Sequence, residues 1–406
     1  IDKMIFVAVP QAGTPQAVGA ILHGYNQSLP IKPLSLFGMT EATARELARN
    51  MPSVYNLLPS ASYFTYADDP VITISADPLL APWRTAYAPD GIIHSGERLR
   101  DFLTDESRAV LPVSDPLTAP IVGNAALLNA SEMLHTTLDT WVPPNGIALT
   151  EIAGWGEETL KTIAYYQGTK STCTAFKADS TCAAMISTPA LQYSPKTVLD
   201  GDGTVVIPSA LWTTASTTVA KYWVNLRDYG ASGIRGSTIN RKHADILEVP
   251  QLRTFLQNII TNANTGPLPQ FVSTSTPVNT DESKVLLRFT LHSPLTLNLY
   301  DNLGNHTGFS TTTNSLEENI PGSRYLTFGE VQYISVPSSA NLALIMDGYA
   351  DGSFTFDIEE AQGDIVIATT TFSGIPSFTN TKVTMDIPEN AGIDGASDLR
   401  MDVQGD

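Results

Sequence analysis

The sequence predicts an α/β domain with a mainly parallel sheet, followed by an antiparallel β-sandwich. Residues 1–264 contain continuous apolar runs typical of buried strands, separated by segments with helical periodicity. Residues 282–390 contain short runs in which apolar and polar residues alternate, with turn residues between them. Residues 1–264 carry 23 acidic and 18 basic side chains, whereas residues 265–406 carry 18 and 5. This shift in charge marks a domain boundary.

Composition excludes several classes of protein. The 406-residue chain is 42% hydrophobic, which is enough apolar surface for a core. No stretch of 18 uncharged apolar residues occurs, so no transmembrane helix is predicted. The net charge of −18 makes nucleic acid and anionic lipid poor partners, because both repel the chain. Only 16% of residues are charged, and this favours an exported protein, extracellular or at the cell surface.

Three strands of the first domain follow from apolar runs. Met4–Val9 is predicted as a strand buried on both faces, and Ile147–Ile152 as the next one. Lys221–Leu226 is the third. Gln192–Val198 and Val205–Ile207 are shorter strand-like runs that flank a Gly-rich turn.

Helical periodicity appears in three other segments. Thr40–Met51 and Ser95–Leu103 are predicted helices that lie between the first two strands, and Ala244–Asn262 is a longer one. A long insertion between two buried strands is usually a cap over a site, so we expect a cap over about residues 22–140. A packed subdomain without a gating role is the alternative.

The two cysteines, Cys173 and Cys182, lie nine positions apart between segments that we interpret as polar loops. In an oxidising compartment they can close a small disulfide loop worth roughly 2–3 kcal/mol. Two free thiols are one alternative. A metal pair is another, but it needs further ligands, and no His lies between residues 136 and 242. We therefore predict the disulfide.

An acid and a histidine stand at positions suited to catalysis. Asp202 follows a predicted strand in a Gly-rich turn, and His243 comes 41 residues later, directly before a predicted helix. In open α/β sheets, ligands bind at the carboxyl ends of the strands, where such loops gather. A plain turn and the start of a calcium loop are alternatives for Asp202. The calcium alternative fails because the segment after Thr204, Val-Val-Ile-Pro, has no oxygen ligands. A surface residue is the alternative for His243.

Four segments occur in this order over about residues 1–260: the strand and turn at 2–15, Met-Pro-Ser-Val-Tyr-Asn-Leu-Leu-Pro-Ser at 51–60, Asp-Gly-Asp-Gly-Thr-Val at 200–205, and His-Ala-Asp-Ile-Leu at 243–247. Together they resemble the lecithin:cholesterol acyltransferase-like family of α/β-hydrolases. The resemblance implies a partial α/β-hydrolase sheet with a large cap. It also implies that Asp202, rather than Asp200, and His243 are the acid and the base of a Ser-Asp-His triad. In such a triad the histidine takes a proton from the serine and returns it to the leaving group, while the aspartate orients the ring.

The nucleophile that this family requires is missing from the sequence. It occupies a Gly-x-Ser-x-Gly elbow, and no such pattern occurs in the chain. We expect this serine upstream of residue 1, in a parent protein of which this chain is the C-terminal part, so the chain alone is expected to be inactive. A non-catalytic relative is the alternative.

Three histidines of the cap and three tryptophans are weaker candidates, and we interpret them as ordinary core or rim residues rather than as parts of an acyl site. They are His23, His94, His135, Trp83, Trp141 and Trp155.

The last 140 residues are predicted to form the β-sandwich. Eight strands are expected, at 285–291, 295–300, 325–328, 332–336, 342–346, 353–358, 365–371 and 382–387. The polar stretch from Asn262 to Pro277 suits an exposed linker. The sandwich is expected to attach the protein to a cell surface, a glycan or a partner, or to serve as a spacer.

The sequence therefore predicts residues 1–264 as the C-terminal part of an α/β-hydrolase domain, 265–280 as a linker, and 281–406 as a β-sandwich with an acidic tail. The expected activity is that of an exported serine-type ester hydrolase or O-acyltransferase acting on lipid or other acyl esters. No metal and no organic cofactor is implied. The competing class is a non-catalytic cell-surface binding or adhesion protein that uses the β-sandwich. Oligomeric state is left open.

Overall fold

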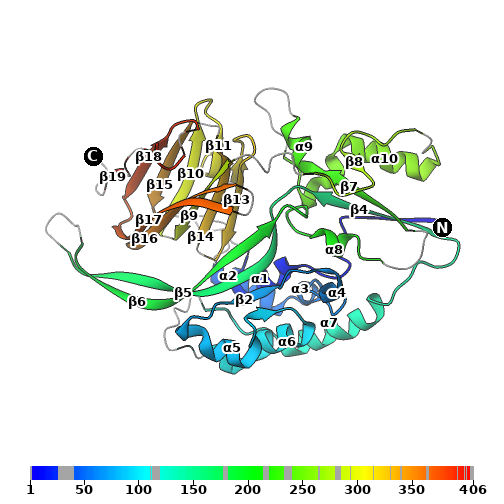
Figure 1. Cartoon of the computed structure of the whole chain (residues 1–406), viewed down its shortest axis with the longest axis horizontal. Coiled ribbons are helices and arrows are strands. Elements are labelled where there is room, and N and C mark those ends of the chain that lie inside the picture. The colour runs from blue at the N-terminus through cyan, green and yellow to red at the C-terminus, as the bar shows by residue number, and fades with distance from the viewer. Residues whose placement is uncertain are drawn as a thin grey trace.

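The computed structural model describes most of the chain. The described residues are 2–25, 41–109, 111, 119–176, 182–213, 219–232, 240–263, 266–278, 285–292, 294–313, 315–329, 331–338, 341–362, 365–390, 392–396, 398 and 400–402. The protein is mixed α/β, with several sheets and a large antiparallel all-β region. Figure 1 shows three parts: a small parallel sheet near the N-terminus, a helical cap below it, and a β-sandwich to one side.

The first sheet contains the three predicted strands. β1 (Lys3–Val7), β4 (Ala148–Trp155) and β7 (Val219–Asn225) are parallel, and β8 (Val272–Ser273) pairs antiparallel with β7. The strand order is β1-β4-β7-β8. All of β1 is half-buried rather than buried on both faces as predicted, because among the described strands β1 lies at the edge and pairs with β4 alone.

Two segments that follow the strands of this sheet along the chain differ from the prediction. The expected helix at 244–262 is divided into a 3-10 segment, η3 (His243–Glu248), and α10 (Pro250–Thr261). Pro250 has no N–H and is well suited to start a helix, so the division falls there. The expected strand at 205–207 is absent, and α8 (Ile207–Ala210) begins there. α9 (Leu226–Ala231) follows β7 directly.

The cap contains both predicted helices. α2 (Glu41–Asn50) and α6 (Gly96–Thr104) are present, and the Ser95 side chain caps α6 by accepting a bond from the Arg98 N–H. Thr40 lies outside the described residues. The remaining cap elements are α1 (Pro15–His23), α3 (Pro52–Asn56), α4 (Tyr63–Tyr66), β2 (Ile72–Ile74), η1 (Pro78–Leu80), α5 (Ala81–Tyr87), β3 (Ile92–Ile93), η2 (Glu106–Ala109) and α7 (Ala125–Leu138).

A long β-hairpin joins the cap from outside its expected range of 22–140. β5 (Thr159–Phe176) and β6 (Cys182–Val198) pair with each other, and β5 also pairs with β2, so the second sheet has the order β3-β2-β5-β6. The cysteines therefore lie in strands and not between polar loops. The backbone register pairs Cys173 with Met185 and Cys182 with Phe176. The side chains of both cysteines lie outside the described residues, so the disulfide stays a prediction.

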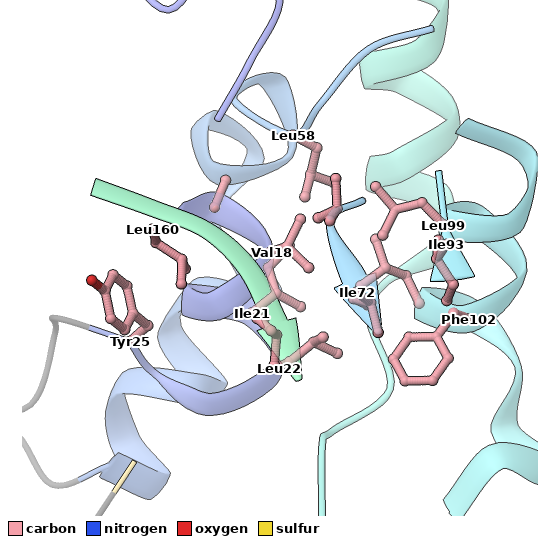
Figure 2. Packing of buried hydrophobic residues seen from close by; sticks show 14 of the residues in the cluster. Val18, Ile21, Leu22, Tyr25, Leu58, Ile72, Ile93, Leu99, Phe102 and Leu160 are labelled. Atoms are coloured by element: carbon pink, nitrogen blue, oxygen red, sulfur yellow. The ribbon is translucent and has the colours of Figure 1, made fainter. Parts of the chain in front are cut away.

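The cap core forms where α1 meets the second sheet. Figure 2 shows Val18, Ile21 and Leu22 of α1 packed among side chains of the sheet and of the neighbouring helices. These three residues are fully buried, and each stabilises the fold by about 1.5–3 kcal/mol relative to an exposed side chain. Phe328, a β-sandwich residue, belongs to the same core and contacts Tyr25 at a ring distance of 4.9 Å.

The β-sandwich contains all eight predicted strands. They are β9 (Val285–His292), β10 (Leu295–Asp301), β13 (Arg324–Phe328), β14 (Val331–Pro337), β15 (Leu342–Gly348), β16 (Gly352–Gln362), β17 (Ile365–Ser377) and β18 (Lys382–Ile387). Three short strands were not predicted: β11 (His306–Ser310), β12 (Ser315–Glu318) and β19 (Arg400–Asp402). The two sheets have the orders β12-β11-β10-β15-β18-β19 and β13-β14-β9-β16-β17. They enclose a core of their own.

The segment between the two domains is not simply an exposed linker. Part of it is β8, and the Asn225 N–H donates a 2.8 Å bond to the Phe271 carbonyl. Val272 is buried against the first sheet, because this apolar residue pairs with Val224 of β7. In the described part of the chain, no helix has the length and apolar character needed to cross a membrane.

Candidate active site

The turn that carries Asp202 is fixed at the carboxyl end of β4. The Glu157 N–H, just beyond β4, donates a 3.1 Å bond to the Gly201 carbonyl. The Thr159 hydroxyl accepts from the Gly203 N–H and donates to the Glu157 carbonyl, both at 2.8 Å. The turn is thus bonded to the backbone beyond β4 at two points.

The Asp202 carboxylate is buried and pre-organised. Its side chain is 1% exposed, and its Oδ1 accepts backbone bonds from Thr204 at 3.0 Å and Val205 at 2.8 Å. Two backbone N–H groups fix the direction in which a carboxylate points. Close packing requires a glycine at 154, since a Cβ there would lie 2.6 Å from the Asp202 Cβ.

His243 contacts Asp202 through two hydrogen bonds. Its backbone N–H donates to the Asp202 carbonyl at 2.8 Å, and its ring Nδ1 lies 2.9 Å from Asp202 Oδ2. Because a carboxylate only accepts, Nδ1 carries the proton. The structure therefore brings together the two side chains that the sequence predicted as partners.

The second ring nitrogen of His243 is available. The side chain is 32% exposed, and within the described ranges no hydrogen-bond partner lies at Nε2. The hydrogen bond to Asp202 raises the pKa of His243 above its ordinary value, although partial burial opposes the shift. A neutral ring with its proton on Nδ1 has a bare Nε2, which is the form that a general base needs.

Four charged residues beside this pair were missed from the sequence. Arg324 of β13 bonds Glu157 at 2.5 Å, and Lys242 bonds Glu318 of β12 at 2.7 Å. We call these four residues the interdomain ion-pair cluster. No sequence signal indicates it, because each pair joins two domains and separates its members by more than 70 positions.

A second network lies under the loop after β1. Glu151 of β4 is fully buried, and its Oε1 accepts from Gln11 Nε2 at 2.6 Å and from the Thr213 N–H at 3.2 Å. Lys221 lies 3.7 Å from Oε2. This network fixes the chain at the carboxyl end of β1.

The other cap candidates have structural partners. His135 bonds Asp139 at 3.0 Å and the Asn56 carbonyl at 3.0 Å, so both of its ring nitrogens are engaged. His23 is fully buried and bonds the Tyr165 hydroxyl at 2.7 Å. Burial lowers its pKa well below the ordinary value, with smaller effects of the charges of two buried arginines.

The remaining four side chains of that set also have structural contacts. Trp83 and Trp155 are buried, and Trp141 packs on Phe6 at a ring distance of 5.8 Å. His94 lies with Nδ1 3.3 Å from the Asp69 carbonyl. These placements agree with their interpretation as core and rim residues.

A cavity of about 620 Å³ lies elsewhere, between the β5–β6 hairpin and the β-sandwich. Lys196, Arg288, Asp357 and Glu359 are among its lining residues, and Asp202 and His243 are not. The described residues contain no group of three or more His, Cys, Asp or Glu side chains arranged to hold a metal ion. No known protein-family model matches the chain, and no curated protein matches it.

Proposed function

We propose that this chain carries the general base, His243, and its orienting acid, Asp202, of a serine-type ester hydrolase or O-acyltransferase. The substrate class is a lipid or another acyl ester. One observation carries the proposal: a buried carboxylate, fixed by two backbone N–H groups, holds the ring of His243 by Nδ1 and leaves Nε2 open. The pair lies at the carboxyl ends of parallel strands, where α/β-hydrolases have their sites.

The proposed chemistry follows the triad scheme. A serine hydroxyl attacks the acyl carbon while its proton moves to Nε2 of His243, and Asp202 stabilises the imidazolium. The leaving alcohol takes that proton as the ester bond breaks. Water or an acceptor alcohol then gives its proton to Nε2 and attacks the acyl-enzyme, and the serine regains its proton as it leaves. Water as acceptor makes the protein a hydrolase, and an alcohol makes it a transferase.

We propose that the serine comes from a Gly-x-Ser-x-Gly elbow upstream of residue 1. In the described part of the chain, β1 is the edge strand of its sheet, and this supports the proposal because a further parallel strand can pair there. We propose export of the protein on the low charged fraction of the sequence.

The first test is the coding region upstream of residue 1. A Gly-x-Ser-x-Gly within about thirty residues is expected, because the motif needs a strand, a turn and a helix of ordinary length. The protein that includes it should hydrolyse a chromogenic acyl ester and be labelled by a serine-directed phosphonate. The 406-residue chain alone should do neither. A protein that includes the upstream region and yet lacks both activities contradicts the proposal.

A second function, non-catalytic binding through the β-sandwich, is favoured by the cavity of about 620 Å³. Its volume is in the range of ligand pockets. Its lining contains positively charged hydrogen-bond donors and negatively charged acceptors. We propose a cell-surface glycan as the partner class for this alternative. Glycan hydroxyls can hydrogen-bond to both the donors and the acceptors of the lining, and they add no net charge. Glycan binding that Asp357→Asn abolishes, in a protein without esterase activity, would favour it.

A further inference from the structure

We propose that the β-sandwich is a structural part of the candidate active site, and that Glu318 and Arg324 are positioning residues for Asp202 and His243. The inference rests on the proposed function, because positioning of the pair matters only if the pair acts on a substrate. It contradicts the interpretation of the sandwich as a spacer.

The Arg324–Glu157 pair holds the turn that carries Asp202. Glu157 is 1% exposed and Arg324 is 13% exposed, so both charges are largely removed from water. The backbone N–H and carbonyl of Glu157 bond the Asp202 turn, directly through Gly201 and indirectly through Thr159. Arg324 therefore acts on Asp202 through a residue that the turn itself contacts.

The Lys242–Glu318 pair holds the segment that carries His243. Lys242 directly precedes His243, and its Nζ lies 2.8 and 2.7 Å from the two carboxylate oxygens of Glu318. Asn240 adds a 3.4 Å bond to the Glu318 backbone carbonyl. The two loops that meet at the Asp202–His243 bond are therefore each attached to the sandwich by an ion pair.

Hydrogen bonds within the sandwich hold Glu318 and Arg324 in place. Glu318 ends β12 and Arg324 begins β13, and the connection between them is fixed by a 2.6 Å bond between the buried hydroxyls of Thr307 and Ser323. Glu318 Oε1 also accepts from the Tyr325 N–H at 2.7 Å. Because Glu318 and Arg324 are themselves held by these bonds, they can position the two loops that carry Asp202 and His243.

The charges in the interdomain ion-pair cluster act on one another. Burial raises the pKa of Glu157, while Arg324 and then Lys242 oppose that shift and Glu318 adds to it. Each acid of the cluster is thus ion-paired with one cation from the opposite domain. Removal of one charge changes the environment of the other three.

The test is a ¹⁵N-histidine NMR titration of the intact 406-residue chain and its variants, because it requires no nucleophile. Glu318→Gln and Lys242→Gln each break the Lys242–Glu318 pair, one by removing the acid and the other by removing the base. The double variant Arg324→Met with Glu157→Gln removes the other pair without leaving a buried charge. We expect the pKa of His243 to fall by roughly half a unit or more towards its ordinary value in each variant, because the bond to Asp202 weakens. Amides of Gly203, Val205 and His243 should exchange with deuterium several-fold faster.

Two controls separate positioning from general loosening of the fold. The pKa of His135, which lies in the cap and bonds Asp139, should not change in any of these variants. Ser335→Ala removes another bond between the domains, to Glu158 at 3.1 Å, and should leave His243 unchanged. An unchanged pKa of His243 with unchanged amide exchange, in variants that melt cooperatively, overturns the inference. A shift of equal size in Ser335→Ala or at His135 overturns it too. Absence of esterase activity overturns the proposed function alone.

Discussion

Among the described residues, His243–Asp202 and His135–Asp139 are histidine–aspartate pairs of nearly equal geometry and different character. His243 Nδ1 lies 2.9 Å from Asp202, and His135 Nδ1 lies 3.0 Å from Asp139. The difference is at Nε2. In His135 this nitrogen meets the Asn56 carbonyl at 3.0 Å, whereas in His243 it has no partner among the described residues.

This difference decides which ring can act as a base. A carboxylate and a carbonyl both only accept, so His135 satisfies both partners only as a doubly protonated imidazolium. Hydrogen bonding to Asp139 accordingly raises the pKa of His135. His243 satisfies its one partner as a neutral ring and keeps Nε2 free to take a proton. A His–Asp contact is therefore not sufficient evidence for catalysis, and the second nitrogen has to be examined.

The largest expected effect separates the two pairs by activity. In a protein that includes the serine elbow, His243→Ala and Asp202→Asn should each lower kcat by roughly 10⁴, because the proton acceptor or its correct tautomer is lost. His135→Gln should leave kcat within a factor of about two. Ester turnover measured for the three variants checks this. Equal losses in all three, or full activity in His243→Ala, would contradict the assignment.

The next largest effect concerns stability, and here the His135–Asp139 pair should matter more than the His243–Asp202 pair. His135→Ala should lower the free energy of unfolding by about 2–3 kcal/mol, because Asp139 and the Asn56 carbonyl lose a largely buried partner. His243→Ala should cost about 1 kcal/mol, since that ring is one-third exposed and Asp202 keeps two backbone bonds. Urea unfolding of the 406-residue chain provides the comparison. A larger loss in His243→Ala would mean that the Asp202 pair, and not the Asp139 pair, is the structural one.

The smallest effect concerns pH. The pKa of His243 is raised in the folded state, so the folded chain binds the proton more tightly than the unfolded chain. The resulting stabilisation is full below about pH 6.5 and is lost as the pH rises through the folded pKa.

Turnover should show the opposite dependence, because only the neutral ring of His243 is a base. In the protein that includes the elbow, kcat/KM should rise with pH, with a midpoint above about 6.5. Asp202→Asn should move that midpoint down, because the first cause of the raised pKa is the bond to Asp202. A pH–rate profile over the neutral range measures both. A midpoint that stays unchanged in Asp202→Asn would mean that the aspartate does not set the basicity of the ring.

The contrast between the pairs also explains what the sequence could predict. His135 and Asp139 are one helical turn apart in α7 and its C-cap, so local periodicity alone places them together. Asp202 and His243 are 41 positions apart, and neither periodicity nor spacing brings them together. We predicted the pair from the order of the two residues in a resemblance to α/β-hydrolases, which implies that their loops meet.

The strands were predictable where alternation or a long apolar run identifies them, as in all eight predicted strands of the β-sandwich. The predicted run Gln192–Val198 is the end of β6, but the rest of the β5–β6 hairpin was missed because its outer half is rich in Thr, Ser and Ala, a composition that resembles a loop. β8 was missed because two residues give no periodicity. The interdomain ion-pair cluster could not be predicted for a different reason. The packing of two domains against each other leaves no local pattern in the sequence of either domain.

The central claim is that the ring of His243 can accept a proton at Nε2 and that the ring of His135 cannot. ¹⁵N-histidine NMR of the intact chain tests this claim most directly. As the pH rises, His243 should reach a neutral form with the proton on Nδ1 and a bare Nε2. His135 should remain doubly protonated past the ordinary imidazole pKa of about 6.5. A neutral His243 with the proton on Nε2 would contradict the account, because that tautomer does not bond Asp202 and has no site for a substrate proton.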